Sequence, residues 1–370
     1  MPSLGVFLSN NIGLGTWWRI GSLSREVALY KKFVEHGWDV SFYTYDRRRK
    51  LPDIGFAANI YSQWPLLFPK KLGFLYRSLL PFLFFRKGRK TDIIITNQAH
   101  SSGPLISAGR LWGAKIIARC GQVYGESAEV LGKSGRGVQK KTSKEKLIFE
   151  EADRCIVPTK ELRDWTCRNY GIPSEKITVI PNYVDTQCFR PNDGTKKDFD
   201  IICIGRLVAK KRNRLLLEAL SRTQMKIHII GNGRLKDKLA DLAKQNQLQV
   251  KITQRIEHSL LPQHINRSKI YVNLAEWEGH PKALIEAMAC GCACIGAKSP
   301  GIKNLIIDGQ TGILVDPEPL QIRRAINSVL ENEELREHLG KHARDYAVEH
   351  FSLDKVCEQY EKVFEEVLAK

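Results

Sequence analysis

Two glutamates, Glu278 and Glu286, are the residues best suited to chemistry, and seven residues lie between them. Glu278 lies in a Gly/Pro turn after an apolar, strand-like run, and Glu286 lies about one turn inside a helix that begins near Pro281. The free amides at the start of a helix favour a phosphate or a sugar oxygen, and a carboxylate there accepts hydrogen bonds from hydroxyl groups. The pair predicts a site for a sugar or a ribose, with helix packing and capping as the structural alternative.

Two cations, Arg206 and Lys211, follow another strand-like run that ends at Ile204. Arginine offers planar donors and lysine a mobile point charge, so the two together could hold a diphosphate leaving group. Solvated surface charge is the alternative for this pair. A third signal, the glycine turn in residues 229–235 (IIGNGRL), is weak, because close packing requires glycine as often as a phosphate does.

These residues need a scaffold that brings the ends of several strands together, and the chain alternates strand-like and helix-like segments along its length. Such alternation is typical of parallel sheets covered by helices. Ligands of these sheets bind beyond the carboxyl ends of the strands. The predicted strands are Leu4–Leu8, Asp39–Tyr43, Ile93–Thr96, Lys115–Ala118, Arg154–Val157, Ile177–Ile180, Asp200–Ile204, Lys226–Ile230, Val250–Ile252, Ile270–Asn273, Cys292–Ile295 and Ile313–Val315.

A polar, turn-rich segment, Pro191–Lys197, divides the strand series in two. We therefore predict an α/β protein with two Rossmann-like, doubly wound domains, residues 1–190 and 191–350, which face each other across a cleft. Residues 351–370 contain an amphipathic helix, Leu353–Leu368, that we expect to pack back on the N-terminal domain. A cleft between two sheets suits a reaction between two substrates.

The net charge of the 370-residue chain is +18, from 58 Lys and Arg against 40 Asp and Glu. Residues 1–190 hold 30 basic and 16 acidic side chains, whereas residues 191–370 hold 28 and 24. Residues 47–90 alone carry eleven basic side chains and one acid, interleaved with apolar ones. This composition favours a segment that lies on an anionic membrane surface, the alternative being a buried helix, Leu72–Phe85, with a solvated basic rim. We expect no nucleic-acid partner, because no recognition motif accompanies the charge.

The start of the chain is too short and too polar for a signal peptide, and no apolar run reaches the length that spans a bilayer. The nine cysteines are scattered, which favours free thiols in a reducing cytoplasm. Cys290, Cys292 and Cys294 are interpreted as small residues in and before a buried strand rather than as metal ligands. We expect a cytoplasmic protein that is peripheral at the inner face of the cell membrane.

The Glu278–Glu286 block, the Arg206–Lys211 pair and the glycine turn, in this order and spacing, resemble the retaining glycosyltransferases of family 4 (glycosyl transferases group 1), which have the GT-B fold. The resemblance covers the chain well from Ala152 to the C-terminus and is weaker before it. Further matching segments are Ala152–Thr159, Val179–Asp185, Phe189–Pro191, Asp308–Val315 and Phe351–Asp354.

The resemblance implies a role for each matching residue. Arg206 and Lys211 would bind the nucleotide diphosphate, Glu286 the ribose, and Glu278 the hydroxyls of the donor sugar. The donor would also contact the first-loop glycines and the start of the later helix, at Gly13, Gly15, Gly279, His280, Pro281 and Lys282. His100 matches loosely a family histidine that contacts the donor sugar, and we place it with Glu278, Arg206 and Lys211 among the catalytic residues.

Four sites depart from the family pattern, namely Thr16–Trp18, His280 in place of an aromatic residue, Lys282 in place of a small or polar residue, and Lys303–Asn304 in place of Pro-Glu. Arg119, at the end of a predicted strand, could hold donor or acceptor. The Asp198-Phe-Asp200 sequence resembles a metal-binding signature of another glycosyltransferase fold, but it precedes its strand and so lies at the wrong end for a site. We expect no metal and no cofactor, because cations can stabilise the leaving diphosphate.

The function that follows from the resemblance is a retaining hexosyltransferase. It would transfer a sugar from a nucleotide-sugar donor, with a UDP-sugar favoured over GDP-mannose, to a lipid-linked or growing surface glycan in polysaccharide biosynthesis. The alternatives are a nucleotide-sugar epimerase of the same fold and a non-catalytic basic protein peripheral to the membrane.

Overall fold

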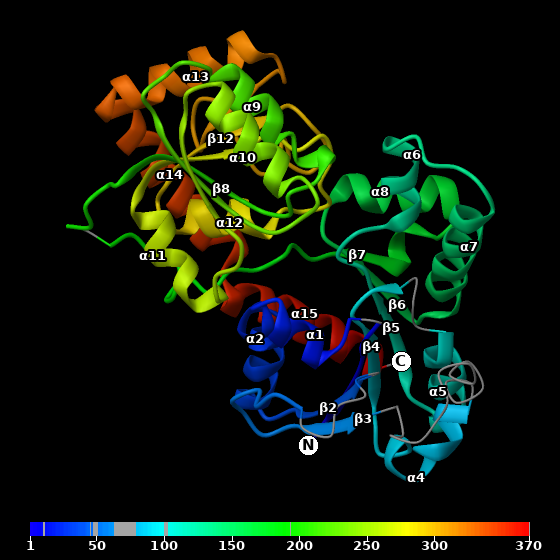
Figure 1. Ribbon diagram of the computed structural model, residues 1–370. Helices are drawn as coiled ribbons and strands as arrows, with labels where there is room; N and C mark the ends of the chain where they lie inside the picture. The colour runs from blue at the N-terminus through cyan, green and yellow to red at the C-terminus, as the bar shows by residue number, and fades with distance from the viewer. Residues whose placement is uncertain are drawn as a thin grey trace. The chain divides into compact units, whose positions relative to one another are not determined.

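The computed structural model describes residues 1–9, 12–44, 46, 51–62, 79–99, 103–192 and 194–369. The chain forms two compact units, Met1–Pro181 together with Val356–Lys370, and Asn182–Lys355 (Figure 1). The first boundary lies earlier than the residue 190/191 division that the sequence predicts. The reason is that residues 182–190 pack in the second unit, where Val184 pairs with Ser352 and the Phe189 side chain is buried in the core.

The first unit contains a sheet of seven parallel strands in the order β3-β2-β1-β4-β5-β6-β7. The order reverses between β1 and β4, because β2 and β3 extend the sheet on one side of β1 and the later strands extend it on the other. The strands are β1 Ser3–Phe7, β2 Asp39–Thr44, β3 Asn59–Ser62, β4 Ile93–Thr96, β5 Lys115–Arg119, β6 Arg154–Val157 and β7 Ile177–Val179.

Helices cover both faces of this sheet. On one face, α2 and α15 lie side by side (Figure 1), and the Phe364 ring of α15 lies 5.2 Å from Phe33 and 5.1 Å from Trp38 between ring centroids. On the other face, α5 and α7 cover a core that includes stacked Phe7 and Tyr43. The helices are α1 Leu14–Arg19, α2 Leu23–Glu35, α4 Phe85–Gly88, α5 Gly103–Trp112, α6 Tyr124–Val130, α7 Arg136–Glu151, α8 Lys160–Tyr170 and α15 Leu353–Leu368.

The second unit contains a sheet of six parallel strands in the order β10-β9-β8-β11-β12-β13. Here the order reverses between β8 and β11. The strands are β8 Phe199–Ile204, β9 Lys226–Ile230, β10 Gln249–Thr253, β11 Ser268–Asn273, β12 Ala293–Ala297 and β13 Ile313–Val315. The two sheets confirm the predicted α/β class with doubly wound domains.

Successive side chains of a strand point to opposite faces, so the six-stranded sheet has two apolar cores. Ile202, Tyr271 and Cys294 pack under α12 and α14, whereas Ile201, Ile270 and Ile295 pack under α9, α10 and α13. The helices are α9 Asn213–Ala219, α10 Lys236–Gln245, α11 Leu261–Asn266, α12 Lys282–Ala289, α13 Pro319–Glu331 and α14 Glu333–Phe351, with short 3₁₀ turns η4 Ala209–Lys211 and η5 His258–Leu260.

Of the segment predicted to lie on a membrane, residues 51–62 and 79–90 are described, and residues 47–50 and 63–78 lie outside the described residues. Leu80 is buried, whereas the side chains of Leu79, Phe82 and Leu83 are more than half exposed, at 51%, 63% and 57%. The basic side chains that follow are also exposed, namely Arg86, Lys87, Arg89 and Lys90. Within the described residues, no helix is both long enough and apolar enough to cross a membrane.

Candidate active site

The reversal of strand order between β8 and β11 determines where the second unit can bind a ligand. From β8 the chain moves outward to β9 and β10, and from β11 it moves the other way to β12 and β13. The loops after β8 and β11 therefore leave the sheet in opposite directions, and such switch points are where open parallel sheets bind ligands. The predicted site residues Arg206, Lys211 and Glu278 all follow these two strands.

Lys211 and Glu278 meet at this switch point, as an ion pair between the Lys211 ammonium and one Glu278 oxygen. Both side chains are only partly exposed, 16% for Lys211 and 14% for Glu278, so solvent screens the pair less than it screens a surface pair. The two loops are also joined through the backbone, because the Glu276 amide donates to the Lys210 carbonyl at 2.8 Å. The structure thus brings together a cation and a carboxylate that lie 67 positions apart in the chain.

The loop after β12 holds Glu278 from its other side. The Glu278 amide donates to the Pro300 carbonyl at 3.1 Å, and the next residue, Gly301, has a φ of +82°. A Cβ atom at Gly301 would lie 2.1 Å from the Glu278 carbonyl oxygen, so only glycine fits there without moving the backbone. The position of Glu278 therefore depends on a close approach between two loop backbones.

The glycine turn after β9 has a packing explanation. A Cβ atom at Gly231 would lie 1.8 Å from the Gly205 carbonyl oxygen, and one at Gly233 would lie 2.3 Å from the Leu207 carbonyl oxygen. The turn thus lies against the loop that carries Arg206, whose own side chain is exposed. These two glycines are accounted for by backbone contact, without a phosphate.

Helix α12 begins at Lys282 with Pro281 as its N-cap residue, one position later than the sequence predicts. His280, just before it, is buried, and its Nδ1 accepts a hydrogen bond from the Asn182 amide at 3.3 Å. The Asn182 side chain donates in turn to the His280 carbonyl at 2.7 Å. Burial lowers the pKa of His280 to about 3, so the ring is neutral. His280 therefore fixes the start of the second unit against the turn before α12.

Glu286 lies in the middle of α12 with 1% of its surface exposed. One of its oxygens lies 2.9 Å from Nε2 of His258, a residue of η5 after strand β10. The Phe189 ring packs against His258 with 4.9 Å between ring centroids. No local motif marks His258 in the sequence, and only the fold brings it to Glu286.

Asn273 is a second residue that the sequence analysis does not single out. It ends β11, is 6% exposed, and lines a small cavity together with Gly205 and Lys211. Its side-chain Nδ2 has no hydrogen-bond partner within the described part of the chain. A polar residue at the end of an otherwise apolar strand was the sequence signal for it.

The predicted donor contacts of the first unit lie after β1, at its own switch point. Gly13 is the N-cap residue of α1, and the Gly15 amide donates to an Asp46 carboxylate oxygen at 3.1 Å. That same oxygen accepts a hydrogen bond from Thr44 at 2.6 Å. His100, the other predicted residue of this unit, lies outside the described residues. The turn after β1 is thus held by a carboxylate that no sequence motif marks.

Arg119, at the end of β5, makes hydrogen bonds within the first unit. Its guanidinium donates to the Asn97 carbonyl at 3.2 Å and to the Tyr360 hydroxyl at 3.3 Å. It thereby joins the loop after β4 to helix α15.

The Asp198-Phe-Asp200 sequence lies at the amino end of β8, away from the switch-point loops. Asp198 is ion-paired with Arg267 at 2.6 Å, and Asp200 with Lys269 at 2.8 Å. Both carboxylates therefore have cationic partners from the chain itself. Cys292 and Cys294 are buried, and burial raises the pKa of Cys292 to about 12, which keeps that thiol protonated.

Two family models match the chain in tandem. The model described as Glycosyltransferase Family 4 matches residues 27–187, and the model described as Glycosyl transferases group 1 matches residues 186–346. The chain belongs to the group 1 glycosyltransferases. The Lys211–Glu278 pair and Glu286 of this glycosyltransferase all lie within the group 1 match.

Some of the similar proteins are named as sugar transferases. One curated relative is an N-acetylgalactosamine-N,N'-diacetylbacillosaminyl-diphospho-undecaprenol 4-alpha-N-acetylgalactosaminyltransferase of Campylobacter jejuni, 28% identical over 54% of this chain and 57% of its own. The chain spans about three fifths of the length of the curated relatives it matches first.

Solved structures share the fold over the whole chain. A sucrose-phosphate synthase from Thermosynechococcus elongatus has a TM-score of 0.79 at 18% identity and covers 100% of both chains. The Anabaena protein HepE, in complex with UDP and glucose, has a TM-score of 0.78 at 15% identity and covers 99% of this chain and 100% of its own. These likenesses confirm the GT-B fold of the glycosyltransferase.

Proposed function

We propose that the protein is a retaining glycosyltransferase that moves a sugar from a UDP-sugar to a lipid-linked or growing surface glycan at the membrane. The observation that carries this proposal is the ion pair of Lys211 and Glu278 at the β8/β11 switch point. The two charges balance each other when no donor is bound. A diphosphate would draw the ammonium of Lys211 toward itself, and the carboxylate of Glu278 would then accept hydrogen bonds from sugar hydroxyls.

In the proposed reaction, the bond between the anomeric carbon and the diphosphate breaks with its electron pair on the diphosphate oxygen. The acceptor oxygen forms the new bond on the same face of the sugar and gives up its proton to the departing diphosphate. Lys211 and the exposed Arg206 would stabilise the charge that develops on the leaving group, so no metal is required for this step. Glu286, fixed by His258, would accept hydrogen bonds from the ribose hydroxyls.

UDP is the favoured nucleotide, because the similarly folded HepE is described with UDP and glucose. Thermal unfolding of the purified protein with UDP, GDP and ADP tests this choice. We expect UDP to raise the unfolding midpoint most, and Lys211→Ala to remove the shift, whereas Lys210→Ala should retain it. A larger shift with GDP or ADP would replace UDP as the donor nucleotide, and no shift with any of the three would contradict the proposal.

The reaction type needs a separate assay, in which UDP-sugars are incubated with and without a polyprenyl-diphosphate glycan. A transferase releases UDP and extends the acceptor only when the acceptor is present. Conversion of the sugar within the UDP-sugar, independent of acceptor, would instead identify an epimerase.

The membrane part of the proposal depends on the exposed Phe82 and Leu83 and on the basic side chains of residues 86–90. Apolar side chains of this kind enter the interfacial region of a bilayer, while basic ones contact lipid phosphates. Each basic residue near an anionic surface contributes about 1 kcal/mol, so a few contacts could hold the protein reversibly. The acceptor in the name of the Campylobacter relative is carried on diphospho-undecaprenol, which supports a lipid-linked acceptor.

Vesicle flotation tests this surface. We expect the protein to float with vesicles of phosphatidylglycerol and phosphatidylcholine but not with phosphatidylcholine alone. Phe82→Ser combined with Leu83→Ser should abolish flotation. Leu320→Ser is the matched control, because Leu320 is 58% exposed but lies in the second unit. Equal flotation of both variants, or none by the unaltered protein, would contradict the membrane assignment.

A further inference from the structure

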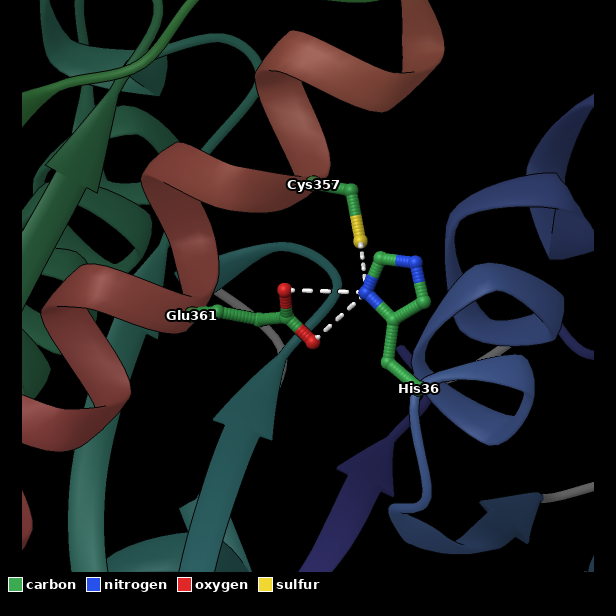
Figure 2. A group of neighbouring side chains, drawn as sticks. All are labelled: His36, Cys357 and Glu361. Atoms are coloured by element: carbon green, nitrogen blue, oxygen red, sulfur yellow. Dashed lines mark hydrogen bonds and ion pairs between the residues drawn. The ribbon is translucent and has the colours of Figure 1, made fainter.

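Three side chains of different metal-ligand types converge where helix α2 ends against helix α15 (Figure 2). His36 is the residue that follows α2, and α15 supplies Cys357 and Glu361, which lie four positions apart on one side of the helix. All three donor atoms, the His36 Nδ1, the Cys357 Sγ and a Glu361 oxygen, lie within 4.8 Å of one another. Among the described residues, this is the one such group that the structure contains.

We propose that His36, Cys357 and Glu361 bind a zinc ion that fastens the C-terminal helix to the first unit. Zinc prefers imidazole nitrogen, thiolate and carboxylate ligands at about 2.0–2.3 Å, which places the donor atoms of a tetrahedral site about 3.3–3.6 Å apart. The His36 Nδ1 lies 3.0 and 3.1 Å from the two Glu361 oxygens and 3.9 Å from the Cys357 sulfur. The Cys357 sulfur and a Glu361 oxygen lie no more than 4.8 Å apart, so these two side chains must approach each other to complete the geometry, with water as fourth ligand.

One ring nitrogen faces both the carboxylate and the sulfur (Figure 2). A single imidazole nitrogen carries either one proton or one lone pair, so it cannot make a full hydrogen bond to both groups. A cation among the three donors satisfies all of them at once.

The surrounding packing holds the donors in place before any ion arrives. Phe33 of α2 lies 6.1 Å from Tyr360 and 5.2 Å from Phe364 of α15, measured between ring centroids, so the two helices are already joined by an apolar contact. Cys357 is fully buried. The side chains of His36 and Glu361 are 41% and 19% exposed, which leaves a route from solvent for the ion.

The binding of zinc to these ligands can be written with charges and protons accounted for. Zinc replaces the proton of the Cys357 thiol, which is released to solvent, and the ionised Glu361 and neutral His36 complete the set. The two negative ligands neutralise the charge of the ion. A thiolate ligand disfavours magnesium and calcium, which prefer oxygen. The ligands belong to the first unit, so the ion has a structural role separate from the sugar-transfer residues, for which we expect no metal.

Cobalt is the probe for the first test, because zinc is spectroscopically silent. The chelator-treated full-length protein should bind one Co²⁺ with the visible bands of a tetrahedral site and a thiolate-to-cobalt charge-transfer band, and Zn²⁺ should displace it. Bound cobalt with a purely octahedral spectrum and no charge-transfer band would overturn the proposal. So would an absence of binding.

Variants identify the ligands. Loss of a residue that only hydrogen-bonds to a metal ligand already weakens metal binding by about 10–100-fold. His36→Gln, Glu361→Gln and Cys357→Ser each remove a ligand itself and should therefore weaken zinc binding by about 100-fold or more. His36→Gln is the decisive variant, because its side chain is partly exposed and the fold should tolerate the change. Its unfolding midpoint without metal should match that of the unaltered protein, while the zinc-dependent rise should be lost.

Two controls carry the same chemical changes elsewhere. Cys188→Ser removes an exposed thiol of the second unit, and Glu358→Gln alters an exposed carboxylate of α15 itself. Both should bind zinc normally. Zinc binding that persists in His36→Gln, or that disappears with Cys188→Ser, would overturn the assignment whatever the outcome of the transferase assays.

Discussion

The two sheets reverse their strand order in the same way, yet the loops at the two reversals are constructed differently. In the second unit, a cation and a carboxylate from different loops, Lys211 and Glu278, face each other. In the first unit, the turn at Gly13 is held by Asp46, a carboxylate that already accepts two hydrogen bonds from its own unit. Under the proposed function, we expect donor binding to depend on charged side chains at the β8/β11 reversal and on the backbone of the turn at the β1/β4 reversal.

Replacing Lys211 by alanine should have the largest effect on this comparison. The loss of a preorganised charge that stabilises a transition state costs about 10²–10³-fold in rate, and Lys211→Ala would also leave Glu278 without its partner. We expect kcat to fall by about this factor while the protein stays folded. Sugar transfer from the preferred donor, followed as nucleotide release, measures the effect.

Lys210→Ala is the matched control, because Lys210 is adjacent but places its ammonium 4.9 Å from the Trp277 ring centre. Its kcat should change little. Full turnover by Lys211→Ala would remove the distinction between the two reversals, and so would an equal loss in Lys210→Ala.

Glu286→Gln should have the next largest effect. The substitution keeps the shape of the side chain but removes the charge that would accept hydrogen bonds from a ribose, a loss of about 1.5–3 kcal/mol or about 10–100-fold. We expect most of this loss in the KM for the donor, measured by initial rates. Glu276→Gln, a change at a more exposed carboxylate of the loop after β11, should leave KM unchanged. An unaltered KM for the donor in Glu286→Gln would show that Glu286 does not contribute to donor binding.

The fold could be predicted further than the site. Apolar strands such as Ile93–Thr96 and Ile270–Asn273 are visible in the sequence, because buried parallel strands are continuous apolar runs. Strand β3 (NIYS) was missed because it is short and has polar ends. Helix α14 was not predicted, because alanines, Ala343 and Ala347, supply part of its buried face and give little periodic contrast.

Within the site, residues that follow strands could be selected from the sequence, but their partners could not. Lys211 and Glu278 lie within motifs, whereas His258 and Asp46 come to their partners through the fold alone. The sequence indicated that glycines are needed after β9 but not why. Only coordinates show that Gly231 and Gly233 face backbone carbonyls of the loop after β8.

Substitutions of glycine test the loop contacts at the two reversals through their effect on the free energy of unfolding. A Cβ at Gly301 would meet the Glu278 carbonyl at 2.1 Å, and a φ of +82° adds backbone strain. We expect Gly301→Ala to lower the free energy of unfolding by roughly 2 kcal/mol and to weaken donor binding, because the Glu278 loop must move. Chemical denaturation and a donor titration measure the two effects.

Substitutions at two other glycines distinguish backbone strain from the contact with Glu278 as causes of the destabilisation. Gly309 has a φ of +74° and no atom near its missing Cβ, so Gly309→Ala should show the backbone strain alone and leave donor binding intact. Gly13→Ala would meet the Asp46 side chain at 2.4 Å, and a side chain moves more readily than a backbone, so its cost should be smaller than that of Gly301→Ala. Equal losses of unfolding free energy in Gly301→Ala and Gly309→Ala would mean that the contact with Glu278 contributes nothing to stability.

The last comparison is the response of the two units to acid. Burial lowers the pKa of His280 in the second unit from 6.5 to about 3. Its contribution to stability is complete above pH 6.5 and is lost as the pH falls toward 3, because only the unfolded chain then binds the proton. Between pH 6.5 and pH 5 the loss amounts to about 2 kcal/mol. In the first unit, burial raises the pKa of Glu145. A raised carboxyl pKa has the opposite effect on the pH dependence, so stability there is lost as the pH rises.

Hydrogen exchange read separately in peptides of the two units, at a series of pH values and corrected for intrinsic exchange rates, measures the difference. The second unit should lose protection as the pH falls from 6.5 to 5, and the first should not. His280→Gln should flatten the slope of the second unit without altering that of the first. The residual slope should come from His228, whose pKa burial lowers to about 4, and from His264, whose pKa burial also lowers. An unchanged slope in His280→Gln would mean that the His280 ring takes up a proton in the folded state. The start of the second unit would then be less firmly fixed than the hydrogen bond between Asn182 and His280 indicates.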